Sequence, residues 1–297
     1  MLSHRHHYIP EFFIKGFINP SKQMWVYNKI TDRISPKQYY PRSIFFKNGG
    51  NTISVNNKDI DIIESEIYKY LDNILSRQFK IIQDNAKPDF ADPALFYYIN
   101  IMAATLYYRK PSSESERVSN LSQLNSLKNI QESWLETQII NAQNLNINQD
   151  DKYKFLSCLL PFIGLKLFGK NNFHPDTSYT TFNIRRPGFI LSDYPIITQN
   201  PLNNFIDLAS NLIFPLTSKR LFCCVEGVSK TINLKKVKSI NLILAIQAKK
   251  YFCSEDKEIL EMSVQLYKNA IKFNLDLVEA RELLFNNILD KRGVKKS

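Results

Sequence analysis

The sequence predicts a single α+β domain over residues 1–297, predominantly helical, with a small, mostly antiparallel sheet and N-terminal hairpins. Apolar residues recur at helical spacing over residues 59–170 and again over residues 239–290. Between these helical parts, residues 178–228 are rich in β-branched and aromatic residues punctuated by proline and asparagine, which is typical of short strands. The hydrophobic content of 44% is typical of a folded chain with a sizeable core, and no internal repeat or long linker divides it.

Residues 1–58 form an N-terminal hairpin segment in this interpretation. MWVYNK (24–29) and RISPK (33–37) flank a turn at Thr31-Asp32, and IFFKNGGNTISV (44–55) contains an Asn-Gly-Gly turn that predicts a second hairpin. Upstream of both, Pro10 is suited to the first turn of a short helix that continues through Glu11 to Gly16.

The helical part, 59–170, is expected to contain four helices. Asp59 or Asp61 caps the first, which runs to about residue 84. The second begins at Asp92-Pro93 and ends at Lys110, before Pro111. A polar helix over 113–144 and a hydrophobic helix over 152–169, kinked at Pro161, follow. The apolar face of the first helix is predicted to consist of Ile63, Ile67, Tyr70, Ile74 and Leu75.

The sheet part, 178–228, is expected to hold four or five short antiparallel strands joined by brief turns. The segments that predict them are YTTFNI, GFIL, IIT, LIFPL and RLFCCV. Helical spacing then returns in KSINLILAIQAKKYF and across residues 256–290, and Gly293 is expected to end the C-terminal helices.

The net charge of +11 indicates that the partner is a polyanion such as nucleic acid. Biased genome composition also produces such a charge. A protein partner stays open as well. There is no run of eighteen apolar residues and no signal-like N-terminus, so we expect a cytoplasmic protein without a membrane partner. The four cysteines lie on apolar segments without CxxC spacing, which predicts buried, reduced thiols.

The stretch SHRHHYIPEFFIKGF (3–17) holds three of the four histidines of the chain. In an extended segment His4 and His6 share one side and His7 takes the other, so the three are poorly placed to ligate one metal, and no metal site is predicted. His7 precedes the aromatic helix. One interpretation makes it a hydrogen-bonded interior histidine that anchors the N-terminus, and the other makes it a general acid or base that needs an orienting carboxylate and a charge stabiliser.

Arg109 and Asp193 are the candidates for those two roles, and each also has a structural interpretation. Arg109 ends an apolar helix, where its guanidinium either holds a phosphate or carboxylate or simply favours the helix dipole and pairs with Glu64. Asp193 follows the apolar strand FIL, where it either presents a carboxylate to a site or caps backbone amides in a turn with Ser192.

Several strings in order along the chain resemble the bacterial family known as domain of unknown function 4238. They are HHYIPEFFIKGF, MWVYNK, IIESEI, LYYRKP, FILSDYPII, IFPLTSK and INLILAIQAKKYF, and together they cover nearly the whole chain. The resemblance implies a set of characteristic positions: His7, Pro10, Phe17, Glu64, Arg109, Ser192, Asp193, Pro195, Pro215 and Leu216. The chain departs from the family at Tyr194, where a small or amide residue is common. The resemblance assigns neither reaction nor cofactor, and it leaves open whether the protein is an enzyme.

Two functions from different classes follow. The first is a hydrolase or nuclease-like enzyme that acts on a phosphodiester or nucleotide polyanion. In this enzyme His7 transfers a proton, Asp193 orients His7 or the nucleophile, and Arg109 stabilises negative charge. Glu64 and Ser192 are its binding residues. The alternative is a non-catalytic effector module that binds nucleic acid or protein and uses the same residues structurally. The sequence contains neither GxSxG nor a phosphate-binding glycine loop, which excludes P-loop nucleotide hydrolysis.

Overall fold

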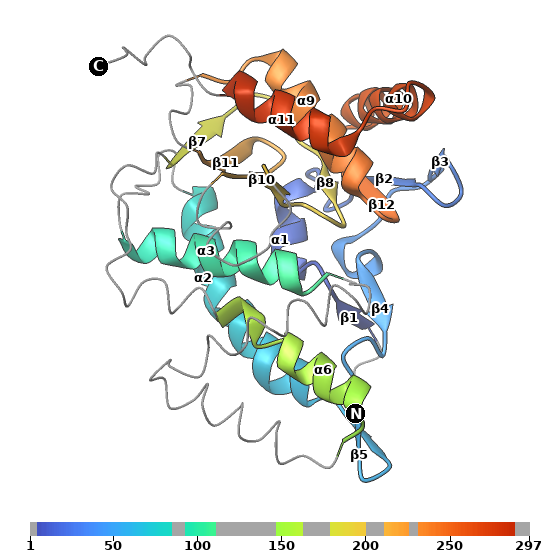
Figure 1. Cartoon of the computed structure of the whole chain (residues 1–297), viewed down its shortest axis with the longest axis vertical. Coiled ribbons are helices and arrows are strands. Elements are labelled where there is room, and N and C mark those ends of the chain that lie inside the picture. Colours follow the sequence, from blue (N-terminus) through green and yellow to red (C-terminus); the bar gives the residue numbers. More distant parts are fainter. Residues whose placement is uncertain are drawn as a thin grey trace. The chain divides into compact units, whose positions relative to one another are not determined.

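The computed structural model describes residues 5–84, 93–110, 147–162, 179–199, 211–225 and 231–288. It is a mixed α+β structure with small antiparallel sheets. The chain divides into two compact units. Unit 1 consists of Met1–Pro10 and Phe45–Phe173, and unit 2 consists of Glu11–Ile44 and His174–Ser297. The expectation of a single domain stays a prediction, and each unit is described by itself below (Figure 1).

Unit 1 contains two small two-stranded sheets. β1 (Arg5–His7) pairs with β4 (Phe46–Asn48), and β5 (Ile53–Val55) pairs with β6 (Lys58–Ile60), both antiparallel. The hairpin predicted within residues 44–55 is therefore wrong, because the two halves of that segment pair with different partners. The turn between β5 and β6 lies at Asn56-Asn57, where the backbone angle φ is 51° and 61°. Asparagine tolerates this left-handed conformation well, so it closes the β5–β6 hairpin.

The first predicted helix is present, but it opens with an irregular turn. η3 (Ile63–Tyr68) is a π-helical turn, and α2 (Lys69–Asp84) continues it. A π turn widens the ladder by one residue, so the buried face shifts relative to a regular helix. Tyr70, predicted to be buried, is 49% exposed. The residues that are buried along this helix are Ile63, Ile67, Tyr68, Leu71, Leu75, Phe79 and Ile82.

In the part of unit 1 that the structure describes, the other α-helices are α3 (Pro93–Tyr108) and α6 (Gln149–Ser157). The side chain of Asn148 caps α6 by accepting a hydrogen bond of 2.9 Å from the backbone amide of Asp151. The helix predicted over 152–169 ends earlier than expected, at Ser157, and a 3-10 turn, η5 (Leu160–Phe162), contains the proline that was predicted to kink it. Proline lacks the amide that a longer helix would need. The polar helix predicted over 113–144 lies outside the described residues.

Unit 2 contains two four-stranded antiparallel sheets. In the first, β2 (Trp25–Asn28) pairs with β3 (Arg33–Ile34), which confirms the predicted hairpin, and also with β12 (Tyr251–Ser254). The fourth strand, β8 (Leu191–Ser192), pairs with β12. The second sheet has the order β7-β11-β10-β9, with bounds Tyr179–Asn183, Arg220–Cys224, Leu212–Thr217 and Ile197–Thr198.

The expectation that residues 178–228 form one sheet is therefore wrong at β8, which joins the sheet of β2, β3 and β12 instead. Short strands are placed by the partners that long-range folding offers them, and nothing in the two residues of β8 encodes that partner. The predicted antiparallel pairing is confirmed for the described strands.

The long helices of unit 2 are α9 (Leu234–Gln247), α10 (Lys257–Lys272) and α11 (Leu277–Ile288), which lie side by side (Figure 1). Asn233 and Asp256 cap the first two through their side chains. The helical pattern read through Tyr251 and Phe252 is wrong at its end, because these residues belong to β12. The described residues of the unit also include the short helices α1 (Glu11–Ile14), η1 (Lys15–Phe17) and η2 (Pro41–Ser43).

The short helix predicted after Pro10 is confirmed by α1 and η1, in which Phe13 and Phe17 are fully buried, with ring centres 5.8 Å apart. All four cysteines are free and buried, as expected. Among the helices of the described residues, none is both long and apolar enough to cross a membrane.

Candidate functional site

Arg109 lies at the centre of a buried charge cluster in unit 1. It extends α3, since its amide donates to the carbonyl of Thr105 at 3.0 Å. Nη1 donates to Oδ1 of Asp72 at 2.8 Å, and Nη2 lies 3.7 Å from Oε2 of Glu64. The guanidinium carbon lies 3.9 Å from the centre of the Tyr68 ring. We refer to Glu64, Tyr68, Asp72 and Arg109 as the Arg109 cluster.

The sequence of η3 and α2 explains why three side chains reach one guanidinium. Glu64, Tyr68 and Asp72 are spaced four residues apart, so they follow one another along one face of the helix. The π turn contains the first two, and π turns are frequent at functional sites. The side chain of Arg109 is only 2% exposed, so its charge is held inside the protein by these partners.

The Arg109 cluster has more negative than positive charge. Burial opposes the charge of Arg109, but the carboxylates of Asp72 and Glu64 outweigh it and raise the pKa of the guanidinium. Burial raises the pKa of the Asp72 carboxyl, and the neighbouring charge of Glu64 adds to that effect, while Arg109 and His7 oppose it. Burial is the main reason why the pKa of Asp72 is raised, and the second carboxylate, which shares the same cation, adds to the effect.

The N-terminal histidines lie on the edge of the same network. His7, half-buried on β1, has its ring centre 5.8 Å from that of Phe46 and acts electrostatically on Asp72. His6 is 2% exposed and accepts a hydrogen bond of 2.8 Å from the amide of Asn51, with Nε2 lying 3.5 Å from Oδ1 of Asp61. The side chain of Asn51 in turn donates to Glu64. His6 is thus a structural link that the sequence did not single out.

Asp193, in unit 2, is engaged by backbone amides. Its carboxylate accepts hydrogen bonds from the amides of Lys249 at 2.9 Å, Lys250 at 2.6 Å and Tyr251 at 3.1 Å. These amides belong to the turn that leads from α9 into β12, so Asp193 fixes that turn. Burial raises the pKa of Asp193, and the three amides oppose the increase. The capping role considered from the sequence is present, on a turn 56 residues away along the chain.

Lys29 holds the other side of the same turn. Its ammonium donates to the carbonyls of Ala245 and Ile246, both at 3.0 Å, and also to that of Ala248. These carbonyls lie at the C-terminal end of α9, where a cation interacts favourably with the helix dipole. Burial lowers the pKa of Lys29 to about 8, and the charge of Asp193 opposes the decrease.

Ser192 closes a local turn. Its hydroxyl donates to the carbonyl of Tyr194 at 2.7 Å and accepts from the amide of Tyr194 at 3.2 Å. The side chain of Gln247 also donates to the carbonyl of Tyr194. Tyr194, at which the chain departs from the family pattern, therefore forms hydrogen bonds through both its backbone carbonyl and its backbone amide.

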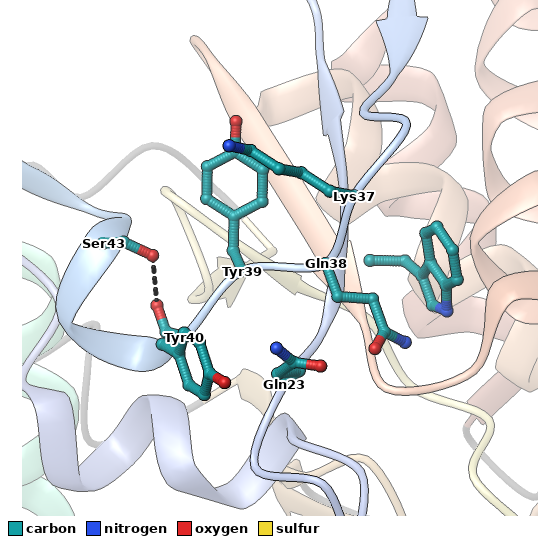
Figure 2. A pocket seen from close by; sticks show the side chains of 7 residues that line it. Gln23, Lys37, Gln38, Tyr39, Tyr40 and Ser43 are labelled. Carbon is teal, nitrogen blue, oxygen red and sulfur yellow. Dashed lines mark hydrogen bonds between the residues drawn. The ribbon is translucent and has the colours of Figure 1, made fainter.

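A pocket of about 680 Å³ lies in unit 2, beside β2. Its walls carry three aromatic residues, Trp25, Tyr39 and Tyr40, and two amide side chains, those of Gln23 and Gln38. Lys37 and Ser43 complete the lining. In the view of Figure 2, the Gln23 amide lies between the ring of Tyr40 and the amide of Gln38.

The structure brings Glu64 and Arg109 together in unit 1, and His7 acts electrostatically on Asp72, which bonds to the same guanidinium. Ser192 and Asp193 belong to unit 2, so the predicted convergence of His7, Arg109 and Asp193 stays a prediction. Sequence reasoning missed Asp72, which the four-residue spacing from Glu64 and Tyr68 would have indicated. It also missed the pocket, whose signal was the basic, aromatic segment around residues 36–43.

Within the described residues, no group of three or more His, Cys, Asp or Glu side chains is arranged to hold a metal ion. The fold defines a mixed α+β protein with small antiparallel sheets and an internal charge cluster. A family model, that of the proteins of unknown function DUF4238, matches residues 5–258. The chain belongs to this family. No curated protein and no solved structure matches it.

Proposed function

We propose that this protein is a non-catalytic polyanion-binding module, with nucleic acid as the favoured ligand and unit 2 as the binding part. The observation that carries the proposal is the division of charge. Unit 1 has 15 Lys and Arg against 14 Asp and Glu, a net charge of +1, whereas unit 2 has 24 against 14, a net charge of +10. Genome composition alone would not place nearly all the excess positive charge in one unit.

The bonding of the expected catalytic residues supports the same proposal. The guanidinium of Arg109 and the carboxylate of Asp193 are each buried and bonded to partners that hold the fold together. The two carboxylates already offset the positive charge of the guanidinium, which weakens its attraction for a substrate phosphate. The surface of unit 2 offers cations in a better position, among them Arg185, Arg186 and Lys219, which are exposed and adjacent because Ile184 bonds to the Lys219 carbonyl at 2.9 Å.

Charge reversal tests the proposal on the full chain. Binding to a labelled oligonucleotide should weaken as salt rises, because each neutralised phosphate releases counterions. Replacing Arg185 and Arg186 together by Glu should weaken binding at least about tenfold at low salt. The matched control replaces two exposed lysines of unit 1, Lys47 and Lys58, by Glu, and it should have a much smaller effect. Equal effects of the two double variants, or no binding to any polyanion, would contradict the proposal.

A second candidate is a phosphodiester hydrolase in unit 1, favoured by the raised pKa of Asp72 beside His7. His7 would accept a proton from water as its oxygen attacks phosphorus, and protonated Asp72 would give a proton to the leaving oxygen. Arg109 would offset the negative charge that develops. Cleavage of an oligonucleotide that His7→Gln and Asp72→Asn both abolish, with folding retained, would support this candidate over the binding module.

A further inference from the structure

The pocket beside β2 has polar groups that the protein itself does not use. Among the described residues, none hydrogen-bonds to the side chains of Gln23, Lys37, Gln38 or to the hydroxyls of Tyr39 and Tyr40. Two amides, each with a donor and an acceptor, one ammonium and two phenolic hydroxyls therefore remain available to a ligand. The pocket lining contains no Asp or Glu and includes one cation, Lys37.

The backbone around the pocket is fixed. Met24 and Tyr39 exchange two hydrogen bonds, of 2.9 Å and 2.8 Å, which hold the segment of Gln23 and Trp25 beside that of Gln38 and Tyr40. Ser43 donates from its hydroxyl to the carbonyl of Tyr40 at 2.7 Å, as Figure 2 shows, and from its amide to the same carbonyl at 2.9 Å. Hydrogen bonds therefore fix the backbone segments that carry the aromatic rings, so less conformational entropy is lost when a ligand binds.

The aromatic rings differ in how much surface they offer. Tyr40 is 48% exposed and is the most accessible ring of the pocket. Trp25 is half-buried, and the ammonium of Lys257 lies 5.3 Å from the centre of its ring. An exposed ring beside cations is the combination on which single-stranded nucleic acids stack their bases while their phosphates contact Lys and Arg.

We propose that this pocket binds one base and the adjoining phosphate of a single-stranded nucleic acid. Tyr40 and Trp25 provide the stacking surfaces, the amides of Gln23 and Gln38 bond to the edge of the base, and Lys37 contacts the phosphate. A volume of about 680 Å³ lies within the range of small-ligand sites. This inference rests on the proposed polyanion binding. It adds that the protein recognises the bases of its ligand as well as the negative charge of the phosphates.

The test compares a ligand that has bases with one that has only charge. Full-length protein is titrated into a labelled single-stranded oligonucleotide of about 12 nucleotides, and heparin binding is measured separately. Tyr40→Ala should weaken oligonucleotide binding about 5- to 100-fold and leave heparin binding within about twofold. Tyr40→Phe should bind like the unaltered protein, because stacking needs the ring and not the hydroxyl.

A matched control is Tyr70→Ala, since Tyr70 is 49% exposed, belongs to unit 1 and is not one of the residues that line the pocket. It should change neither affinity. A second readout does not require removal of Tyr40. The chain has two tryptophans, Trp25 and Trp134, so Trp134→Phe leaves Trp25 as the sole indole, and its fluorescence should be quenched by the oligonucleotide and not by heparin.

The outcomes separate this inference from the proposed function. If oligonucleotide and heparin both bind but Tyr40→Ala weakens neither, and Trp25 is not quenched, the base pocket is overturned and polyanion binding stands. If neither ligand binds at low salt, both proposals fail. If Trp25 responds to a neutral oligosaccharide such as maltoheptaose and not to the oligonucleotide, the pocket is a sugar site and the inference is overturned.

Discussion

Nη1 of Arg109 lies 2.8 Å from Oδ1 of Asp72, which bonds the residue after α3 to the first turn of α2. The contact joins two helices of unit 1 through a pair whose arginine is almost fully buried. Because water cannot reach the guanidinium of Arg109 once the pair is broken, the contact is expected to matter more for stability than an exposed ion pair does.

Arg109→Met should lower the free energy of unfolding by about 3 to 5 kcal/mol, because it leaves Glu64 and Asp72 close together without their shared cation. Urea denaturation followed by circular dichroism measures the change. Arg77→Met is the control, since Arg77 is exposed on the same helix as Asp72, and it should change the free energy by no more than about 0.5 kcal/mol. Equal stability of the two variants would show that Arg109 does not hold unit 1 together.

Asp193→Asn should also be destabilising, by about 1 to 3 kcal/mol. The two oxygens of the carboxylate accept hydrogen bonds from three backbone amides, whereas a carboxamide has only one acceptor oxygen. Glu282→Gln makes the same change of charge at an exposed position of α11 and should be nearly neutral. The same denaturation experiment applies. An Asp193→Asn variant as stable as the control would favour the catalytic role over the capping role.

Lys29 predicts a dependence of stability on alkaline pH. Burial lowers its folded pKa from 10.5 to about 8, so between these values the unfolded chain holds a proton that the folded chain has released. Raising the pH through this range therefore favours the folded state. The free energy of unfolding of the unaltered protein, minus that of Lys29→Met, should increase between about pH 7.5 and 9.5.

The control for this prediction is Lys235→Met, which removes an exposed lysine of α9. Its difference from the unaltered protein should stay constant over the same pH range, because the side chain of Lys235 is exposed to water. A Lys29→Met difference that is equally flat would mean that the ammonium is not desolvated at the end of α9.

Phe13→Ala should destabilise the protein by about 3 to 5 kcal/mol, since its ring is fully buried and its removal leaves a cavity. Phe273→Ala, at a ring that is 76% exposed, is the matched control and should cost less than about 1 kcal/mol. Thermal unfolding gives the comparison. Similar melting temperatures for the two variants would show that the aromatic turn after Pro10 is not docked in the core.

Local patterns in the sequence predicted those elements whose cause is local. The turn after Pro10, the β2–β3 hairpin and the buried cysteines follow from proline geometry, turn chemistry and apolar surroundings. The family was also predicted correctly, because ordered strings along the chain do not depend on contacts in space. One of the two interpretations of Arg109 predicted an ion pair with Glu64, and the structure contains that pair, since a buried arginine needs a carboxylate.

Only the tertiary structure decided which distant segments meet. β1 bonds to β4, and β8 bonds to β12, because backbone groups of short strands accept any partner that the packing of the core brings within reach. The packing of the helices also decided that Tyr70 is exposed and that Arg109 meets Tyr68 and Asp72. The amides that bind Asp193 come from a turn after α9, which no spacing in the sequence indicates, since a carboxylate bonds by proximity in space and not along the chain.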